Sequence, residues 1–287
     1  MSGLPNSLIS CARLIAVCVA LLAAPTASAR LLMWYPFNEG SGTAVHDASV
    51  NGNNLAPEGI GISWNVKSGA PFGGSIYFNG NAMAVASKTE SEVEAHTIDF
   101  LKSVDSNKCT ISLWVNPDIE SQNGPPFGFS RGDLTRVLQA HVLQFGNCWF
   151  DVAAPDSGSD HYRAGLATTL ATNTWTHFAF VYDGSLGSDT LKVYRNGVQI
   201  ASSSDGVGST VDWSQIALAA LGGSQRYTDH WKGAMDDFAM WDEALTPTQI
   251  ASLVSSGVAS VAAPVINSFK ATPGNIGTAG TTTLSWS

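Results

Sequence analysis

Residues 175–199 constrain the fold of this 287-residue chain more than any other segment. They contain two apolar runs with β-strand character, separated by a polar turn. In the first run, Phe178 and Phe180 lie on one face and Val181 on the other. A strand that is apolar on both faces is typical of a position between two packed layers. Asn196-Gly197 ends the segment and favours the two-residue type I′ turn of a β-hairpin.

The composition favours many short strands joined by tight turns. Only 13% of the residues are charged, glycine occurs 28 times, and helical periodicity is nearly absent. A single helix is predicted between Thr246, a suitable N-cap, and Gly257, a suitable stop.

Phe178, Phe180 and Trp114 are expected in the hydrophobic core.

Two further segments carry a recognisable pattern. Residues 34–42 read WYPFNEGSG and are followed by Asp47 and residues 51–53, and residues 232–241 read KGAMDDFAMW. Together with residues 175–199, and in this order, they resemble the laminin G-like group of the concanavalin A-like lectin/glucanase superfamily. The resemblance extends from residue 31 to about residue 250. It implies an all-β fold, a two-sheet antiparallel jelly-roll sandwich, but names no ligand.

The N-terminal residues have the pattern of a secretory leader. Arg13 is the single charged residue among the first 29, residues 14–24 are apolar, and residues 27–29 read Ala-Ser-Ala. This pattern predicts a signal peptide over 1–29 and an exported mature chain beginning at Arg30. The secreted or cell-surface product is expected to have no segment inserted in a membrane.

The C-terminal residues predict the start of a second module. The jelly-roll domain is assigned to 30–256 and a linker of small residues to 257–263. Residues 264–287 alternate like the first two strands of an immunoglobulin-like β domain, which needs roughly 100 residues. A truncated immunoglobulin-like module, with further domains beyond Ser287, is therefore expected.

The acidic charge balance makes nucleic acid an unsuitable partner. The chain has a net charge of −9, and removal of Arg13 with the leader leaves 13 basic against 23 acidic residues, or −10. Binding to a polyanion depends largely on Lys and Arg at phosphates. An acidic excess suits an extracellular protein that holds divalent cations, and it equally keeps a protein soluble.

Two cysteines remain after removal of the leader. Cys109 and Cys148 each begin an apolar strand run and are expected to face the core. In an oxidising compartment this arrangement favours a disulfide, with two buried free thiols as the alternative.

A calcium site is implied by the resemblance. Related sandwich proteins commonly hold a structural calcium ion with an acid after the opening strand, a backbone carbonyl and an aspartate on the closing strand. The matching positions here are Glu39, the carbonyl of Gly80 or a neighbour, and Asp236. Calcium prefers six to eight oxygen ligands, which carbonyls and water can complete. The alternative is that Glu39 and Asp236 cap turns or pair with basic residues.

Loop aromatics and histidines are the candidates for ligand binding. Aromatic faces stack on sugar rings while polar neighbours bind hydroxyl groups. The candidate residues are Trp149, His161, Tyr162, His230 and Trp231. Arg131-Gly132-Asp133 spells an integrin-recognition tripeptide, which a simple turn explains equally well.

Catalysis is not expected from this chain. Asp236 and Asp237 are adjacent, so on a regular strand they face opposite ways and cannot act on one bond. The preferred interpretation is a secreted, non-catalytic laminin G-like module that binds a glycan or another extracellular ligand, such as a protein. Two alternatives remain: an accessory domain of a larger carbohydrate-active enzyme, and a structural or adhesion spacer without a small ligand.

Overall fold

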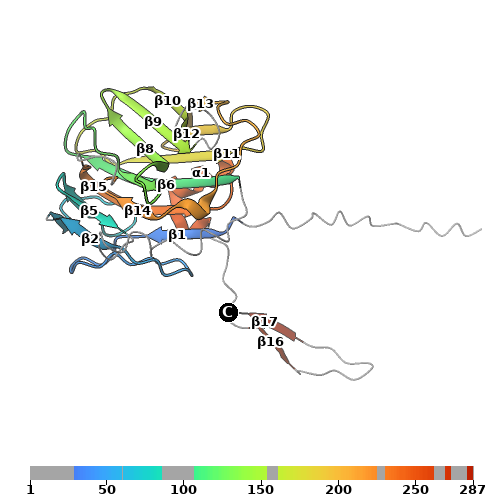
Figure 1. Ribbon diagram of the computed structural model, residues 1–287. Coiled ribbons are helices and arrows are strands. Elements are labelled where there is room, and N and C mark those ends of the chain that lie inside the picture. Colours follow the sequence, from blue (N-terminus) through green and yellow to red (C-terminus); the bar gives the residue numbers. More distant parts are fainter. Residues whose placement is uncertain are drawn as a thin grey trace, which may run out of the picture.

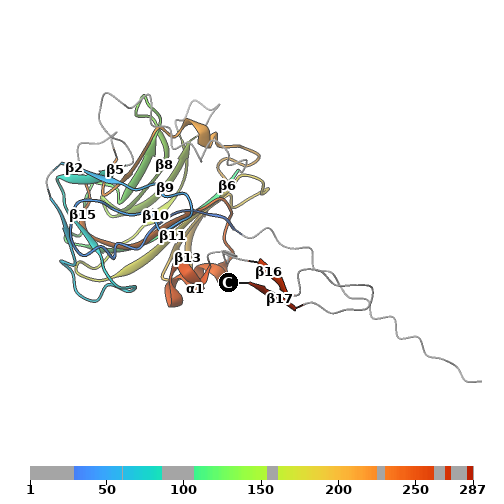
Figure 2. The same ribbon diagram turned by 90° about the horizontal axis from the view of Figure 1, so that it is seen from below.

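The computed structural model describes residues 29–59, 61–85, 107–153, 161–224, 230–261, 269–272 and 283–286. Within these residues two antiparallel sheets pack face to face, and a helix covers part of the outer side of one sheet (Figures 1 and 2). The predicted all-β jelly-roll sandwich is therefore confirmed. The predicted signal peptide lies outside the described residues, apart from its last position.

The eight-stranded sheet contains the first and last strands of the sandwich. Its order is β13 (Val198–Ser203), β12 (Leu191–Arg195), β11 (Thr176–Asp183), β6 (Lys108–Pro117), β15 (Lys232–Trp241), β4 (Ile76–Asn79) and β3 (Ile62–Trp64). The remaining strand, β1 (Leu31–Tyr35), pairs with the second half of β15, while β4 pairs with its first half.

The seven-stranded sheet forms the opposite layer. Its order is β10 (His161–Ala167), β9 (Asn147–Ala153), β8 (Arg136–Gln144), β7 (Phe127–Ser130), β14 (Leu218–Leu221), β5 (Ala82–Val85) and β2 (Ala56–Gly59). Two short 3-10 turns, Trp213–Gln215 and Val258–Ser260, lie in the connections.

Aromatic side chains from both sheets form the centre of the core. The ring of Phe180 on β11 lies 5.8 Å from that of Phe127 and 5.4 Å from that of Phe150, both on the other sheet. Phe178 and Phe180 are fully buried, as predicted. The prediction for Trp114 was wrong: it alternates with Leu113 on β6, and it lies half-buried on the outer face of the eight-stranded sheet.

Helix α1 (Pro247–Ser256) covers the outer face of β11. The side chain of Thr246 accepts a hydrogen bond from the backbone of Gln249, whose own side chain accepts one from the backbone of Thr246. This capping box fixes the start of the helix, and Gly257, at φ 72°, ends it as predicted. Ile250 and Leu253 pack in a second apolar cluster with Ala179, Val181 and Trp241. The strand β11 is thus enclosed by two layers.

The predicted disulfide between Cys109 and Cys148 is not formed. Both residues face the core, as expected, but both are free thiols. Cys109 begins the apolar run of β6 in one sheet, and Cys148 lies on β9 in the other. Burial raises the pKa of the Cys148 thiol to about 12, so both side chains act as small apolar core residues.

The C-terminal strands β16 (Phe269–Thr272) and β17 (Thr283–Trp286) pair antiparallel with each other. Their positions agree with the two strands expected from the sequence. The assignment of an immunoglobulin-like module to them stays a prediction.

Candidate functional site

The outer face of the seven-stranded sheet carries a cluster of polar side chains on β8, β9 and β10. Along β9, Cys148, Phe150 and Val152 face the core, so the alternate residues face outward. We call the outward set the outer-face cluster; it consists of Arg136, Gln139, His141, Trp149, Asp151, His161 and Arg163.

Asp151 is the electrostatic centre of this cluster. It is fully buried, and its carboxylate lies between two guanidinium groups. Arg163 Nε lies 2.5 Å from Oδ1 and its terminal nitrogen 2.8 Å from Oδ2, while Arg136 also donates to Oδ2. His161 Nε2 lies 4.0 Å from Oδ1. Bidentate pairs of this kind fix side-chain orientation as well as charge.

A β-bulge brings Arg136 to this face. Phe129 on β7 pairs with Leu138, but Ser130 pairs with Arg136, so Val137 is the extra residue. Without the bulge, Arg136 would share the core-facing side with Leu138. The extra residue reverses this orientation and allows Arg136 to reach Asp151.

His141 is held in its neutral form within the cluster. Its Nε2 lies 2.5 Å from Nε2 of Gln139, and both side chains are buried. Burial lowers the pKa of His141 to about 4, because the nearby charge of Asp151 only partly offsets the effects of burial and of the two arginines. A neutral imidazole can accept a hydrogen bond from the glutamine amide.

Trp149 forms a half-buried aromatic surface at the edge of the cluster. It lies directly opposite Gly165 on β10, where an added Cβ would come within 2.1 Å of the indole ring. The absence of a side chain at Gly165 therefore allows the ring to lie against the sheet. The guanidinium of Arg163 lies 4.9 Å from the ring centre. Asp151 thus positions Arg163, and Arg163 positions Trp149.

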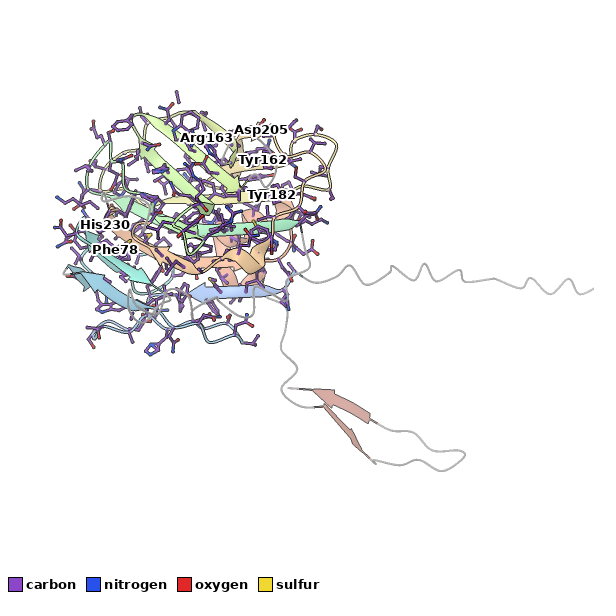
Figure 3. All side chains as sticks on the ribbon, viewed as in Figure 1. Phe78, Tyr162, Arg163, Tyr182, Asp205 and His230 are labelled. Atoms are coloured by element: carbon purple, nitrogen blue, oxygen red, sulfur yellow. The ribbon has the colours of Figure 1, made fainter. Side chains whose placement is uncertain are left out.

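The predicted ligand-binding residues divide into separate groups. Trp149 and His161 meet in the outer-face cluster, but Tyr162 faces the core side and bonds to Ser209, near Asp205 and Tyr182 in Figure 3. Trp231 is fully buried in the core and is therefore wrongly predicted as a sugar contact. His230 lies beside Gly223 and Met83, away from Arg163 (Figure 3).

The sequence interpretation did not propose Arg136, Gln139, His141, Asp151 or Arg163 as site residues. A usable signal was present on β9, because assigning Cys148 and Phe150 to the core leaves Trp149 and Asp151 on the opposite face. No alternation pattern could place Arg136, since its orientation depends on the bulge.

The three predicted calcium ligands do not meet at one point. Gly80 lies beside Lys232, which is four residues along β15 from Asp236, a span of about 13 Å at the usual strand rise. Glu39 accepts a hydrogen bond from the backbone of His46. Among the residues that the structure describes, no three His, Cys, Asp or Glu side chains gather in a metal-binding group. The calcium site stays a prediction that rests on Asp236.

Asp236 and Asp237 both face outward, against expectation. Their strand has an extra residue between Asp236 and Ala239, and Asp237 adopts φ 49°. Met235 and Phe238 consequently both reach the core. Asp236 accepts a hydrogen bond from the backbone of Phe72 at 2.9 Å, and Asp237 accepts one from the Trp34 indole at 2.7 Å. Both acids are buried and accept hydrogen bonds within the domain.

A serine and a histidine are in contact, but without the features of a catalytic pair. Ser112 Oγ lies 2.8 Å from Nε2 of His177, and both residues are buried on the outer face of the eight-stranded sheet. Burial lowers the pKa of His177 to about 3, and among the described residues its Nδ1 has no hydrogen-bond partner to orient the ring. Such a histidine is a poor general base.

The Arg131-Gly132-Asp133 tripeptide lies in the turn between β7 and β8. Arg131 Nε lies 2.5 Å from Oε1 of Gln215, and Asp133 accepts hydrogen bonds from Thr135. Both charged side chains are thus engaged within the protein.

The fold and motifs agree with a sequence comparison. The family model Laminin_G_3, described as concanavalin A-like lectin/glucanases superfamily, matches residues 87–251. The chain belongs to this superfamily. The match includes the outer-face cluster and all of β15, while the opening motif at residues 34–42 precedes it.

Individual relatives share parts of the chain. Mouse (Mus musculus) pappalysin-1 is 34% identical over 98 residues, which is 31% of this chain and 6% of that protein. Domain 4 of AbnA, a GH43 extracellular arabinanase from Geobacillus stearothermophilus, was solved with arabinotriose; it superimposes with a TM-score of 0.59 at 22% identity, covering 79% of this chain and 99% of the domain.

A binding domain of botulinum neurotoxin DC, solved with rat synaptotagmin II, gives a TM-score of 0.53 at 14% identity, covering 79% of this chain and 51% of that chain. At these identities the structural similarities show the fold alone. In the part of the chain that the structure describes, no helix has the length and apolar character needed to cross a bilayer.

Proposed function

We propose that this protein is a secreted, non-catalytic carbohydrate-binding module whose sugar site is the outer-face cluster. The observation that carries the proposal is Trp149, a half-buried indole held against Gly165 with Arg163 near its ring. Sugar rings stack on such aromatic faces, and guanidinium and imidazole groups bind hydroxyls.

The degree of burial of each side chain decides its proposed role in the sugar site. Trp149, His161 and Arg163 are partly exposed and contact the sugar, while Asp151, Arg136, Gln139 and His141 lie beneath them as a rigid support. A preformed site of this kind loses little conformational freedom when the ligand binds. The arabinotriose complex of the structurally similar arabinanase domain supports a glycan ligand, and the leader-like N-terminus supports secretion.

The test is a binding assay with a matched control. The full chain would be screened on a glycan array and by affinity electrophoresis in gels containing arabinan and other polysaccharides. Trp149→Ala is expected to weaken retention at least tenfold. Trp64→Ala removes another half-buried tryptophan, on β3 of the opposite sheet, and is expected to change retention less than twofold.

Two results would contradict the proposal. If the folded protein binds no glycan, a protein ligand or a spacer role replaces it. If glycans bind equally well to Trp149→Ala and the parent, the sugar site lies elsewhere.

A further inference from the structure

The tip of the β8–β9 hairpin combines an unfavourable backbone conformation with an exposed aromatic side chain. The turn consists of Phe145 at φ 50° and Gly146 at φ 78°. Phe145 is 75% exposed, close to the highest exposure among the large apolar residues that the structure describes. Positive φ is uncommon for a bulky side chain because Cβ crowds the following carbonyl.

The same chain contains a favourable version of this turn. The β12–β13 hairpin closes with Asn196 at φ 49° and Gly197 at φ 81°, nearly the same backbone angles. Asparagine tolerates this conformation and dominates such turns. Phenylalanine at the equivalent position 145 therefore adopts an unfavourable backbone conformation and buries little apolar area, so it does not stabilise the folded chain. Strained residues of this kind point to a functional contact.

Hydrogen bonds hold the tip in place. Asn147 donates its side-chain amide to the carbonyl of Phe145 at 3.1 Å, and the backbone of Thr168 donates to Gly146 at 2.9 Å. The amide of Gln144 donates to Asn123 at 2.6 Å. The aromatic ring is thus presented from a fixed backbone beside amide and hydroxyl groups, and Arg195 donates to the side chain of Thr168 at 3.0 Å.

Phe145 belongs to the hairpin that carries the proposed sugar site. Trp149 lies four residues farther along the same chain, a span of at most about 13 Å at the usual strand rise. Asn147, between them, faces outward like Trp149, because it alternates with Cys148. Along the chain, an aromatic, an amide and an aromatic residue therefore follow one another at every second position from the hairpin tip to Trp149.

We propose that Phe145 is a second aromatic contact for carbohydrate, and that the ligand is an extended polysaccharide chain lying along β9. The inference rests on the proposed function and specifies its ligand class. A chain of several sugar units lying along β9 can contact both aromatic residues at once. The amides of Asn147 and Gln144 at the tip suit the hydroxyl groups of a sugar.

The test is Phe145→Asn, which introduces the same Asn-Gly sequence that closes the β12–β13 hairpin. Affinities of the full chain for linear arabino-oligosaccharides of increasing length would be measured by calorimetry. The parent is expected to bind more tightly as the oligosaccharide lengthens, until both aromatic contacts are filled. Phe145→Asn is expected to lose at least fivefold affinity for the long oligosaccharides, to keep that for the short ones, and to melt no lower than the parent.

The controls separate this inference from the proposed function. Val198→Ser alters an exposed apolar residue next to the Asn196-Gly197 turn and is expected to leave all affinities unchanged. Equal binding of long chains by Phe145→Asn and the parent overturns the second contact but leaves the Trp149 site intact. The parent and Phe145→Asn are also tested for binding to lipid vesicles. If the parent binds vesicles and Phe145→Asn does not, with sugar binding unchanged, the tip contacts a membrane and the second carbohydrate contact is refuted. No sugar binding by the parent refutes the proposed function itself.

Discussion

Asp236 should make the stability of the domain depend on pH. The residue is fully buried on β15, and one carboxylate oxygen accepts a hydrogen bond from the backbone of Phe72. Burial, reinforced by the nearby charge of Asp237, raises the pKa of Asp236 from 3.8 to about 7. In the unfolded chain this carboxyl group returns to its ordinary pKa.

The direction and magnitude follow from proton linkage. Because the folded pKa is higher than the unfolded one, the folded state binds the proton more tightly. The resulting stability is fully present below about pH 4 and is lost as pH rises through 7. The interval from 3.8 to about 7, at ~1.36 kcal/mol per pKa unit, corresponds to about 4 kcal/mol.

The assay compares urea unfolding of the parent and Asp236→Asn between pH 4 and pH 8, in chelator. Asparagine remains neutral and resembles the protonated acid, so the free energy of unfolding of the parent should fall relative to the variant by about 4 kcal/mol across this range. His141 and His177 act in the opposite direction, since their lowered pKa values reduce stability as pH falls below about 6.5. Their effects cancel in the comparison. A difference that stays constant within 0.5 kcal/mol would refute the reasoning.

Three further predictions concern packing, charge and metal. Phe180→Ala should destabilise the domain by roughly 3–5 kcal/mol in urea unfolding, because the ring joins both sheets; a melting temperature within a degree of the parent would contradict this. Asp151→Asn should cost roughly 3–5 kcal/mol by removing the carboxylate between two arginines, while Asp205→Asn, at the surface, should change stability by less than about 0.5 kcal/mol. If the calcium site implied by the family resemblance exists, calcium added to chelated protein at pH 7.5 should raise the melting temperature of the parent but not of Asp236→Asn, with magnesium less effective; an equal response in both proteins would remove Asp236 from the site.

The elements with strong local signals were predictable from the sequence. Asn196-Gly197 fixed the hairpin, the two-faced apolar pattern placed β11 between layers, and Thr246 to Gly257 bounded the helix. Each signal arises from contacts within a few residues along the chain. The family resemblance added the sheet arrangement, which local patterns do not contain.

The candidate site was less predictable because it depends on bulges and on pairing between distant strands. One extra residue at Val137 turns Arg136 outward, and one after Asp236 places two acids on the same face. A bulge reverses strand alternation without an obvious sequence mark. Trp231 shows the complementary error: its neighbours read as a loop, yet its indole completes the core.

The pairing of β1 with β15 has a consequence for how the domain folds. Tyr35 lies opposite Phe238, so the first strand finds its neighbour only after some 200 intervening residues have been made. Contacts so distant in sequence slow folding, because the loop between them must be closed first. During synthesis from the N-terminus, β1 therefore waits unpaired until β15 has emerged from the ribosome. The eight-stranded sheet therefore cannot be completed until β15 has been synthesised, and the apolar side chains of β1 have no partner strand until that point.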